Sequence, residues 1–427
     1  MSKFQVILIG AFGFIVVLSV ILFSKYQGGG QKPANVLIWG TLASTDFQNI
    51  LSKTSLNQSK TLQVAYEVKN PETIDSDFVE ALAAGGGPDL IILPHEKIQK
   101  TKNKLTLIPY ASYTERAFKD AFIAGGEIYL TPEGIVALPF ILDPLVMYWN
   151  RSVFTDANLT LPPKYWDEFY SLAEVISKKD NALNIERSAS SLGEFSNITN
   201  AKEIISNLLM QAGTPIVQPV GGKNYSVLAN SFDKPLIPAE AAINFYTQFS
   251  NPGKQFYSWN RSMPKSGNFF LSGKLGIYFG FASELWSIQQ KNPNLNFDVA
   301  LVPSSREAGV NVSFAKFQGL AISKGSKNPT AALAVATILT SAEGIKAVNQ
   351  ALNLPPVRRD LLSEKQSSSY RDVFYRSAIR SNAWLDPDPS KTDAIFKEMV
   401  ESITSGRERT SSAVSRASRQ IGDLLTN

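Results

Sequence analysis

Short apolar segments bounded by glycine, proline and polar residues recur from residue 34 onward. Three of them have the composition of β-strands: ANVLIWG at 34–40, LQVAYEV at 62–68 and PDLIILP at 88–94. Between the second and third, residues 76–84 have helical spacing and are followed by three glycines, as a helix C-terminus often is. Strands alternating with helices predict a parallel α/β sheet, and ligands of such sheets bind beyond the carboxyl ends of the strands.

The remaining chain continues the mixture of strands and helices. Residues 134–150 form a long extended stretch with one internal charge, Asp143. The same patterns predict helices at 162–177, 201–213, 239–249 and 328–340, and strands within 269–280, 297–303 and 319–323. The C-terminal third is expected to be helical, with breaks at Pro355-Pro356 and at residues 386–389.

The N-terminus carries a separate signal. Residues 6–23 form a stretch of eighteen residues without a charge. This length is close to the minimum for a helix that crosses a bilayer core of about 30 Å. No A-x-A cleavage site follows, so an uncleaved signal anchor is favoured over a cleaved signal peptide. We expect a transmembrane helix within residues 1–25 and a flexible linker at 26–33. Flanking lysines are nearly balanced and leave the topology open.

Composition narrows the chemistry. A chain of 427 residues fits two domains or lobes. It contains no cysteine and one histidine, His95, which excludes disulfides, thiolate sites and multi-histidine metal sites. The net charge of +5 is spread along the chain, which does not favour nucleic-acid binding. No cofactor is expected, and His95 is interpreted as structural.

Five segments, in order, carry a resemblance to a known family. They are VLIWG at 36–40, GPDLIILP at 87–94, residues 139–154 followed by PPKYWDEF, residues 270–280, and residues 319–341 followed by Leu354-Pro355. In these segments the chain resembles family 1 extracellular solute-binding proteins of the maltodextrin and multiple-sugar type. The resemblance implies a two-lobed periplasmic-binding-protein fold of type II with the ligand between the lobes. Lobe I is expected at 34–141 and 315–365, and lobe II at 142–314 and 366–427.

The same resemblance implies a function. The chain is expected to be the extracytoplasmic substrate-binding protein of an ABC importer. It would capture a sugar or oligosaccharide by hinge closure and deliver it to permease subunits, as a monomer held at the membrane by its N-terminal helix. No catalysis is expected, and ATP hydrolysis would belong to a partner subunit, because the chain lacks a G-x-x-x-x-G-K-[ST] motif.

Candidate ligand-binding residues follow position by position from the resemblance. The matching positions are Trp39, Thr41 and Ser44, the pair Glu96 and Lys97, and Asp143. The family's stacking tryptophan falls in the region of Phe281 and Glu284. Its aromatic residue near the C-terminus falls on Asp393, with Trp384 nearby, so maltodextrin itself is in doubt. Trp259 is added because it lies in a polar segment, KQFYSWNRS, where a large ring has no obvious core role.

Each candidate has a structural alternative. Asp143 lies in an apolar stretch, so its carboxylate needs partners, which could be ligand hydroxyls or a salt bridge at the hinge. Glu96 and Lys97 could form an exposed charged turn, and Trp39, Trp259 and Phe281 could be core residues.

Two other functions remain open at this stage. A glycosidase would need two carboxylates about 5 to 10 Å apart across the scissile bond, such as Asp143 and Glu284, and the sequence places no such pair. A sensor of the same fold would present its ligand to a membrane receptor rather than to a permease. A permease gene beside this one would favour import.

Overall fold

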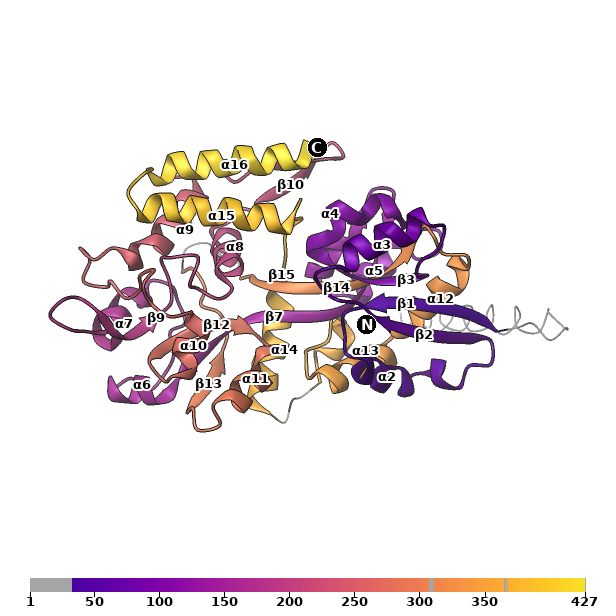
Figure 1. Cartoon of the computed structure of the whole chain (residues 1–427), viewed down its shortest axis with the longest axis horizontal. Coiled ribbons are helices and arrows are strands. Elements are labelled where there is room, and N and C mark those ends of the chain that lie inside the picture. The colour runs from indigo at the N-terminus through magenta and orange to yellow at the C-terminus, as the bar shows by residue number, and fades with distance from the viewer. Residues whose placement is uncertain (1–32, 307–310, 365, 367, 427) are drawn as a thin grey trace, which may run out of the picture.

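The chain forms two α/β lobes joined by strands that belong to both. A computed structural model describes residues 33–306, 311–364, 366 and 368–426. Figure 1 shows the lobes side by side, with β7 (Leu138–Asn150) and β14 (Ser313–Ser323) running from one into the other. The predicted anchor at 1–25, and all but the last residue of the predicted linker at 26–33, lie outside the described residues.

Lobe I contains the parallel sheet that the sequence predicts. β1 (Ala34–Gly40) pairs in parallel with β2 (Leu62–Val68) and with β3 (Leu90–Pro94). Its helices are α2 (Ser44–Ser52), α3 (Ile74–Ala83), α4 (Ile98–Thr101), α5 (Glu115–Ala121), α12 (Pro329–Leu339) and α13 (Ala342–Leu352). In Figure 1, α3, α4 and α5 lie above the sheet and α2 and α13 below it, so both faces of the sheet are covered.

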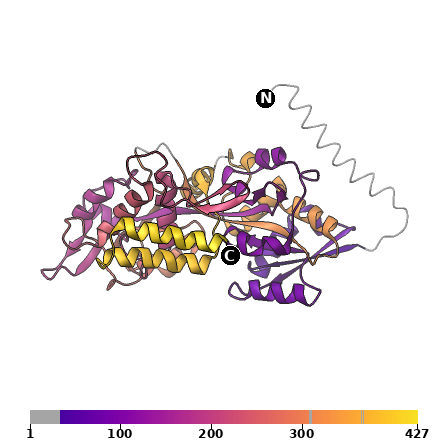
Figure 2. The same ribbon diagram turned by 90° about the horizontal axis from the view of Figure 1, so that it is seen from above.

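Lobe II is built on the second half of β7. This half pairs antiparallel with β12 (Leu275–Phe281) and with β13 (Phe297–Ala300), and β12 pairs in parallel with β9 (Ile185–Ser190). Around them lie α6 (Arg151–Asp156), α7 (Glu168–Ile176), α8 (Ala201–Ala212), α9 (Pro238–Thr247), α10 (Ser266–Leu271), α11 (Glu284–Lys291), α14 (Ser369–Arg380), α15 (Pro389–Thr404) and α16 (Thr410–Thr426). Figure 2 shows α15 and α16 as a pair along one side of lobe II.

The two lobes share one sheet. Its main order is β2-β1-β3-β14-β7-β12-β9-β8, with β8 at Lys178–Lys179. The short strands are β4 (Leu105–Thr106), β5 (Leu130–Thr131), β6 (Gly134–Ile135), β10 (Val217–Val220), β11 (Lys223–Ser226) and β15 (Ser381–Asn382). β14 pairs antiparallel with β3 and with β7, and its register with β7 shifts between Gln318 and Gly319. The hinge between the lobes therefore consists of two strands, β7 and β14, that are hydrogen-bonded to each other, rather than of a flexible linker.

Two predicted elements have different bounds. The helix expected at 162–177 begins only at Glu168, because the segment before it pairs with another loop: the backbone N–H of Trp166 donates to the carbonyl of Ser304 at 3.2 Å. Two consecutive prolines at 162 and 163 also remove two backbone donors. The strand expected at 319–323 is longer and begins at Ser313.

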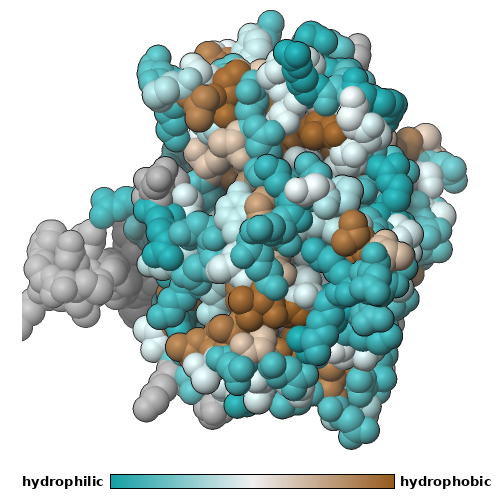
Figure 3. All heavy atoms as spheres, turned by 90° about the vertical axis from the view of Figure 1, so that its left-hand side faces the viewer, coloured by the Kyte–Doolittle hydropathy of each residue, from teal (hydrophilic) through white to brown (hydrophobic). Residues whose placement is uncertain are grey.

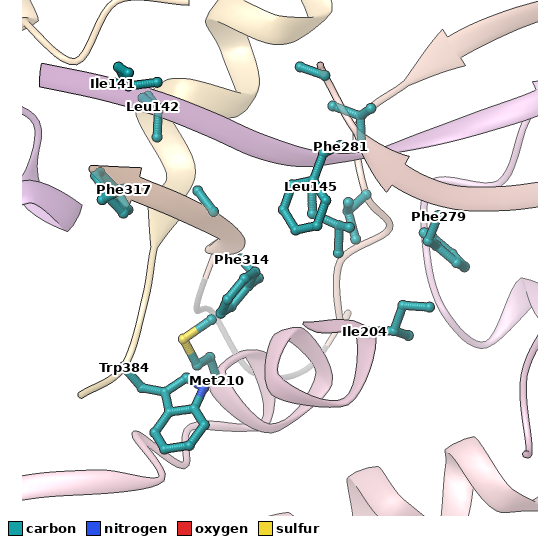
Figure 4. Packing of buried hydrophobic residues seen from close by; sticks show 14 of the residues in the cluster. Ile141, Leu142, Leu145, Ile204, Met210, Phe279, Phe281, Phe314, Phe317 and Trp384 are labelled. Atoms are coloured by element: carbon teal, nitrogen blue, oxygen red, sulfur yellow. The ribbon is translucent and has the colours of Figure 1, made fainter. Parts of the chain in front are cut away.

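Hydrophobic side chains fill the interior around the shared strands. Figure 3 shows the end of lobe II, where hydrophilic residues cover most of the surface and hydrophobic patches are separate. Figure 4 shows the interior between the lobes, with Ile141, Leu142 and Leu145 of β7 near Phe314 and Phe317 of β14, all at most 3% exposed. Among the described residues no single helix is long and apolar enough to cross a membrane. Helices α12 and α13 taken together have the length and the apolar composition of a membrane span, but the two are bent by 65° relative to each other.

Candidate ligand-binding site

A carboxylate and an ammonium group lie opposite each other on the two shared strands. Asp143 of β7 is the register partner of Lys316 of β14. Every other residue of β7 is buried, and Asp143 alone is half-buried. Its Oδ1 accepts a hydrogen bond from the backbone N–H of Ser283 at 3.1 Å. Burial raises the pKa of Asp143 to about 6, although the Ser283 bond and the Lys316 charge oppose this shift.

Lys316 connects this hinge position to lobe II. Its Nζ lies 3.4 Å from Oε1 of Glu203, near the start of α8, and 4.2 Å from the centre of the Phe281 ring. Burial disfavours the charged form of Lys316, but Glu203, Glu96 and Asp143 outweigh this effect and raise its pKa above the ordinary value. Lys316 is therefore an ammonium group that contacts the Glu203 carboxylate and the face of Phe281, and whose charged form Glu96 and Asp143 also favour.

Glu96 brings lobe I to the same charged group. Glu96 is half-buried and lies in the middle of the 3-10 turn at His95–Lys97, which directly follows β3. Burial alone would raise its pKa, but His95 and the ammonium groups of Lys316 and Lys202 give a net lowering. Since Lys202 lies in the first turn of α8 in lobe II, this electrostatic interaction passes between the lobes.

His95 is structural, as the sequence analysis expects. Its side chain is 1% exposed, and its Nδ1 accepts a hydrogen bond from the backbone N–H of Phe317 at 3.2 Å. Burial lowers the pKa of His95. The ring therefore ties the end of β3 to the shared strand β14 as a neutral imidazole near pH 7.

Lys202 fixes the segment before α15 against α8. Its Nζ donates to Oδ2 of Asp386 at 2.5 Å, to Oγ1 of Thr392 at 2.7 Å and to the carbonyl of Pro389 at 3.1 Å. Asp386 is 1% exposed, and burial raises its pKa despite the Lys202 charge. Because these three bonds use all three N–H donors of its ammonium group, Lys202 acts first as a structural clamp at this edge of lobe II.

A pocket of about 360 Å³ lies next to this clamp and is lined by both lobes. Lobe I contributes Ala124, Glu127 and Ile128, and lobe II contributes Met210, Pro215 and Trp384 among others. Trp384 is only 4% exposed, and its Nε1 donates to Oγ of Ser206 at 3.1 Å. Figure 4 shows Trp384 and Met210 together at this position. The tryptophan predicted as a ligand contact thus reaches an interlobe pocket, with its polar atom already paired.

The candidates from the ends of the lobe I strands differ in accessibility. Trp39 is 6% exposed, and Nζ of Lys69 lies 3.7 Å above the centre of its ring. Thr41 and Ser44 are exposed. Lys97 pairs with Asp75 of α3 at 2.9 Å, within lobe I. Of these, Thr41 and Ser44 are open to a ligand as they stand.

Two candidates have structural roles instead. Trp259 is completely buried, its Nε1 donates to Oδ1 of Asn197 at 3.1 Å, and its ring packs edge-on against Phe269; its prediction as a ligand contact is corrected to a core residue of lobe II. Glu284 accepts hydrogen bonds from Tyr278 at 2.6 Å, from the backbone N–H of Phe281 at 2.8 Å and from Asn200 at 3.0 Å. With these three donors, Glu284 supports the end of β12 rather than projecting a free carboxylate.

Phe281 is 3% exposed and lies between Lys316 and Phe314, whose ring centre is 6.4 Å away. Its ring shapes the hinge, and one face is already covered by an ammonium group. Sequence reasoning overlooked the charged partners of this region: Lys202, Glu203, Lys316 and Asp386. One signal was available for Lys316, which is the only charge in the apolar run SFAKFQGLAIS, as Asp143 is in its own run.

Within the part of the chain that the structure describes, no group of three or more His, Cys, Asp or Glu side chains is placed to hold a metal ion.

Two α/β lobes that share crossing strands, with charged side chains of both lobes meeting at the crossing, define a binding protein of the hinged, two-lobed class. The sequence profile of the bacterial extracellular solute-binding proteins matches residues 54–374, more than half of the chain. The chain belongs to this family.

Particular relatives are distant in sequence. The chain is 24% identical to the diacetylchitobiose binding protein DasA of Streptomyces coelicolor over 315 residues, which cover 71% of this chain and 68% of DasA. Its structure resembles a cyclo/maltodextrin-binding protein complexed with maltotetraose, with a TM-score of 0.74, 16% identity and coverage of 94% of this chain and 99% of that one. It also resembles the cyclic alpha-maltosyl-1,6-maltose binding protein of Arthrobacter globiformis, with a TM-score of 0.75, 13% identity and coverage of 92% and 100%. At these identities the likeness shows a common fold.

Proposed function

We propose that this protein captures a sugar or oligosaccharide between its two lobes and delivers it to the permease of an ABC importer. The observation that carries the proposal is the arrangement around Lys316. Its charge acts on Glu96 of lobe I and contacts Glu203 of lobe II, from a strand that belongs to both lobes. A change in the angle between the lobes alters these separations, so a ligand that engages the same groups shifts the equilibrium between open and closed forms.

The polar groups at the crossing suit a ligand rich in hydroxyl groups. Carboxylates of Asp143 and Glu96 accept hydrogen bonds from hydroxyls, and the ammonium group of Lys316 donates to hydroxyl or ring oxygens. Exposed Thr41 and Ser44 add hydroxyls from the rim of lobe I. The proposed set is therefore Asp143, Glu96, Lys316, Thr41 and Ser44, with Trp384 lining the interlobe pocket.

The saccharide class is further supported by relatives. DasA is named for diacetylchitobiose, and the two similar solved structures are named for maltodextrins and for a cyclic maltosyl-maltose. Oligosaccharides are large enough to contact both lobes at once, which is what closure requires.

We propose the lobe bounds 34–141 with 315–365 and 142–314 with 366–427, because the divisions at 141/142 and 314/315 fall inside the shared strands β7 and β14. An extracytoplasmic location agrees with the family. The N-terminal anchor, the monomeric state and the permease partner belong to the same proposal, and binding without catalysis agrees with a family of binding proteins.

Isothermal titration calorimetry of the full chain against mono- and oligosaccharides tests the proposal. We expect one saccharide class to bind and Asp143→Asn to weaken that binding about tenfold or more, since a charge-assisted hydrogen bond is lost. Asp120→Asn, on the exposed face of α5, is the matched control and should bind as the native chain does. Binding of peptides but no saccharide would overturn the ligand class and retain the fold.

A further inference from the structure

A second recess lies on lobe II and is separate from the interlobe site. Its volume is about 650 Å³, within the usual size of small-molecule pockets. One wall is a face of α14 carrying Val373, Arg376 and Arg380, and the other walls are the loop at 161–165, the end of β13 with the loop that follows it to residue 306, and Asn311. None of these residues belongs to the proposed saccharide site.

The charged side chains in the described lining of this recess are all basic, and the carboxylates that pair with two of them lie outside the lining. The described lining contains four basic side chains, Lys164, Arg306, Arg376 and Arg380, and no aspartate or glutamate. A recess lined by one sign of charge concentrates ions of the opposite sign. Hydroxyls of Ser304 and Ser305 supply additional polar groups at the same wall.

The walls of the recess are held in place by contacts of their own. Arg306 stacks on Tyr165, with its guanidinium carbon 3.9 Å from the ring centre, and pairs with Asp167 at 2.8 Å and Glu168 at 3.0 Å. The backbone N–H of Ser304 donates to the carbonyl of Lys164 at 3.0 Å. The two loops are thus joined before any ligand arrives, and the charge of Arg306 is already neutralised.

The two arginines of α14 are not neutralised to the same degree. Arg376 has one exposed ion pair, to Asp372 at 3.7 Å, and among the described residues Arg380 has no ion-pair partner within 4.0 Å. They stand one helical turn apart, where like charges repel. Burial and the charge of Arg376 both lower the pKa of Arg380, as expected for a guanidinium that lacks an anion.

We propose that this recess is a second binding site, for a ligand that carries a phosphate group. The forked guanidinium groups of Arg376 and Arg380 match the oxygens of a phosphate, which they can bind through paired hydrogen bonds. The apolar part of such a ligand would contact Leu161, Pro162 and Val302. A free phosphorylated solute and a phospholipid head group share this chemistry.

Titration of the full chain with pyrophosphate, followed by calorimetry, tests the proposal. We expect saturable binding that weakens at least tenfold in the double variant Arg376→Gln/Arg380→Gln. Arg371→Gln is the matched control, because this arginine lies on the same helix outside the recess. Saccharide affinity is measured in parallel and should not change, which separates failure of this proposal from failure of the proposed function.

A second variant keeps both charges. Ser305→Phe narrows the recess and should also weaken pyrophosphate binding, so the proposal can still be tested if the arginine variant does not fold.

A second experiment compares binding to vesicles of phosphatidylglycerol with binding to vesicles of phosphatidylcholine. Stronger binding to the anionic than to the neutral vesicles, with the difference lost in the arginine variant but kept in Arg371→Gln, identifies a lipid head group as the source. Absence of binding to both probes, or equal binding by the native chain and both variants, overturns the proposal.

Discussion

Asp143 and Lys316 face each other as register partners on the two strands that join the lobes. Both interrupt otherwise apolar runs, and each is half-buried among residues that are nearly all buried. Neither group is neutralised by the other alone, because Lys316 contacts Glu203 and also acts on Glu96. The charges of four side chains at the hinge therefore depend on one another, and a substitution of Lys316 should change the pKa values of Asp143 and Glu96.

Asp143 should make the stability of the protein depend on pH. Its pKa in the folded state is about 6 against an ordinary 3.8, so the folded chain holds this proton more tightly than the unfolded chain does. Its contribution is most favourable below about pH 4 and falls as the pH rises toward 6. The free energy of unfolding of Asp143→Asn, relative to that of the native chain, should therefore increase as the pH rises from about 4 to above 6, by at most about 3 kcal/mol.

Urea unfolding at several pH values between about 4 and 7 measures this difference, since groups shared by the native chain and the variant cancel. A difference that stays constant over the whole range would show that Asp143 ionises normally.

Lys316→Met should destabilise the fold, because Glu203, Glu96 and Asp143 would then lack their shared cation. We expect a loss of about 1–3 kcal/mol in the free energy of unfolding, less than for a fully buried pair, since Lys316 is partly exposed. A double-mutant cycle with Glu203→Gln should give a favourable coupling free energy between the two residues. Additive effects would mean that the 3.4 Å contact carries no net interaction.

Trp259→Phe tests the assignment of this residue to the core. The change removes the hydrogen bond to Asn197 and leaves space in a fully buried position. We expect about 1–3 kcal/mol of lost stability and unchanged ligand affinity in the folded fraction. A large loss of affinity with normal stability would return Trp259 to the binding site.

Gly319→Ala should strain the crossing of the strands. A Cβ at this position would lie 2.8 Å from Cβ of Ala137 and 3.1 Å from the carbonyl oxygen of Leu138, next to the register shift in β14. Overpacking of this kind costs about 1–3 kcal/mol. Thermal unfolding measures the effect.

Gly422→Ala is its matched control, because Gly422 lies inside helix α16 and a Cβ there meets none of the described residues within 4 Å. This change should stabilise the chain by about 0.5–1 kcal/mol. Similar melting temperatures for both variants would contradict the tight packing assigned to Gly319.

Local pattern was sufficient where neighbours along the chain decide the structure. The apolar runs of β1, β2 and β3 appear in the sequence with nearly their observed bounds, and their parallel pairing follows from the intervening helices. The delayed start of α7 was not predictable in this way, because its preceding segment pairs with Ser304, about 140 residues later in the chain.

The site was harder to predict for the same reason. Asp143 was found because a lone carboxylate in an apolar stretch requires partners, but those partners, Ser283 and Lys316, are far along the chain. Trp259 looked free because its own segment is polar, whereas Asn197 and Phe269 bury it. The burial of an aromatic ring depends on which segments, distant along the chain, pack against it. These contacts cannot be predicted from the pattern of a single sequence.

The continuity of β7 and β14 has a consequence for modularity. Each lobe takes central strands of its sheet from segments that also complete the other lobe, so neither lobe is a transferable unit. A lobe expressed alone would expose unpaired backbone groups along a sheet edge, with the aggregation that such edges promote. Calorimetry should accordingly record one cooperative transition for the pair. Recombination between related genes can therefore exchange surface loops and helices, but a chain that takes its two lobes from different relatives should fold poorly.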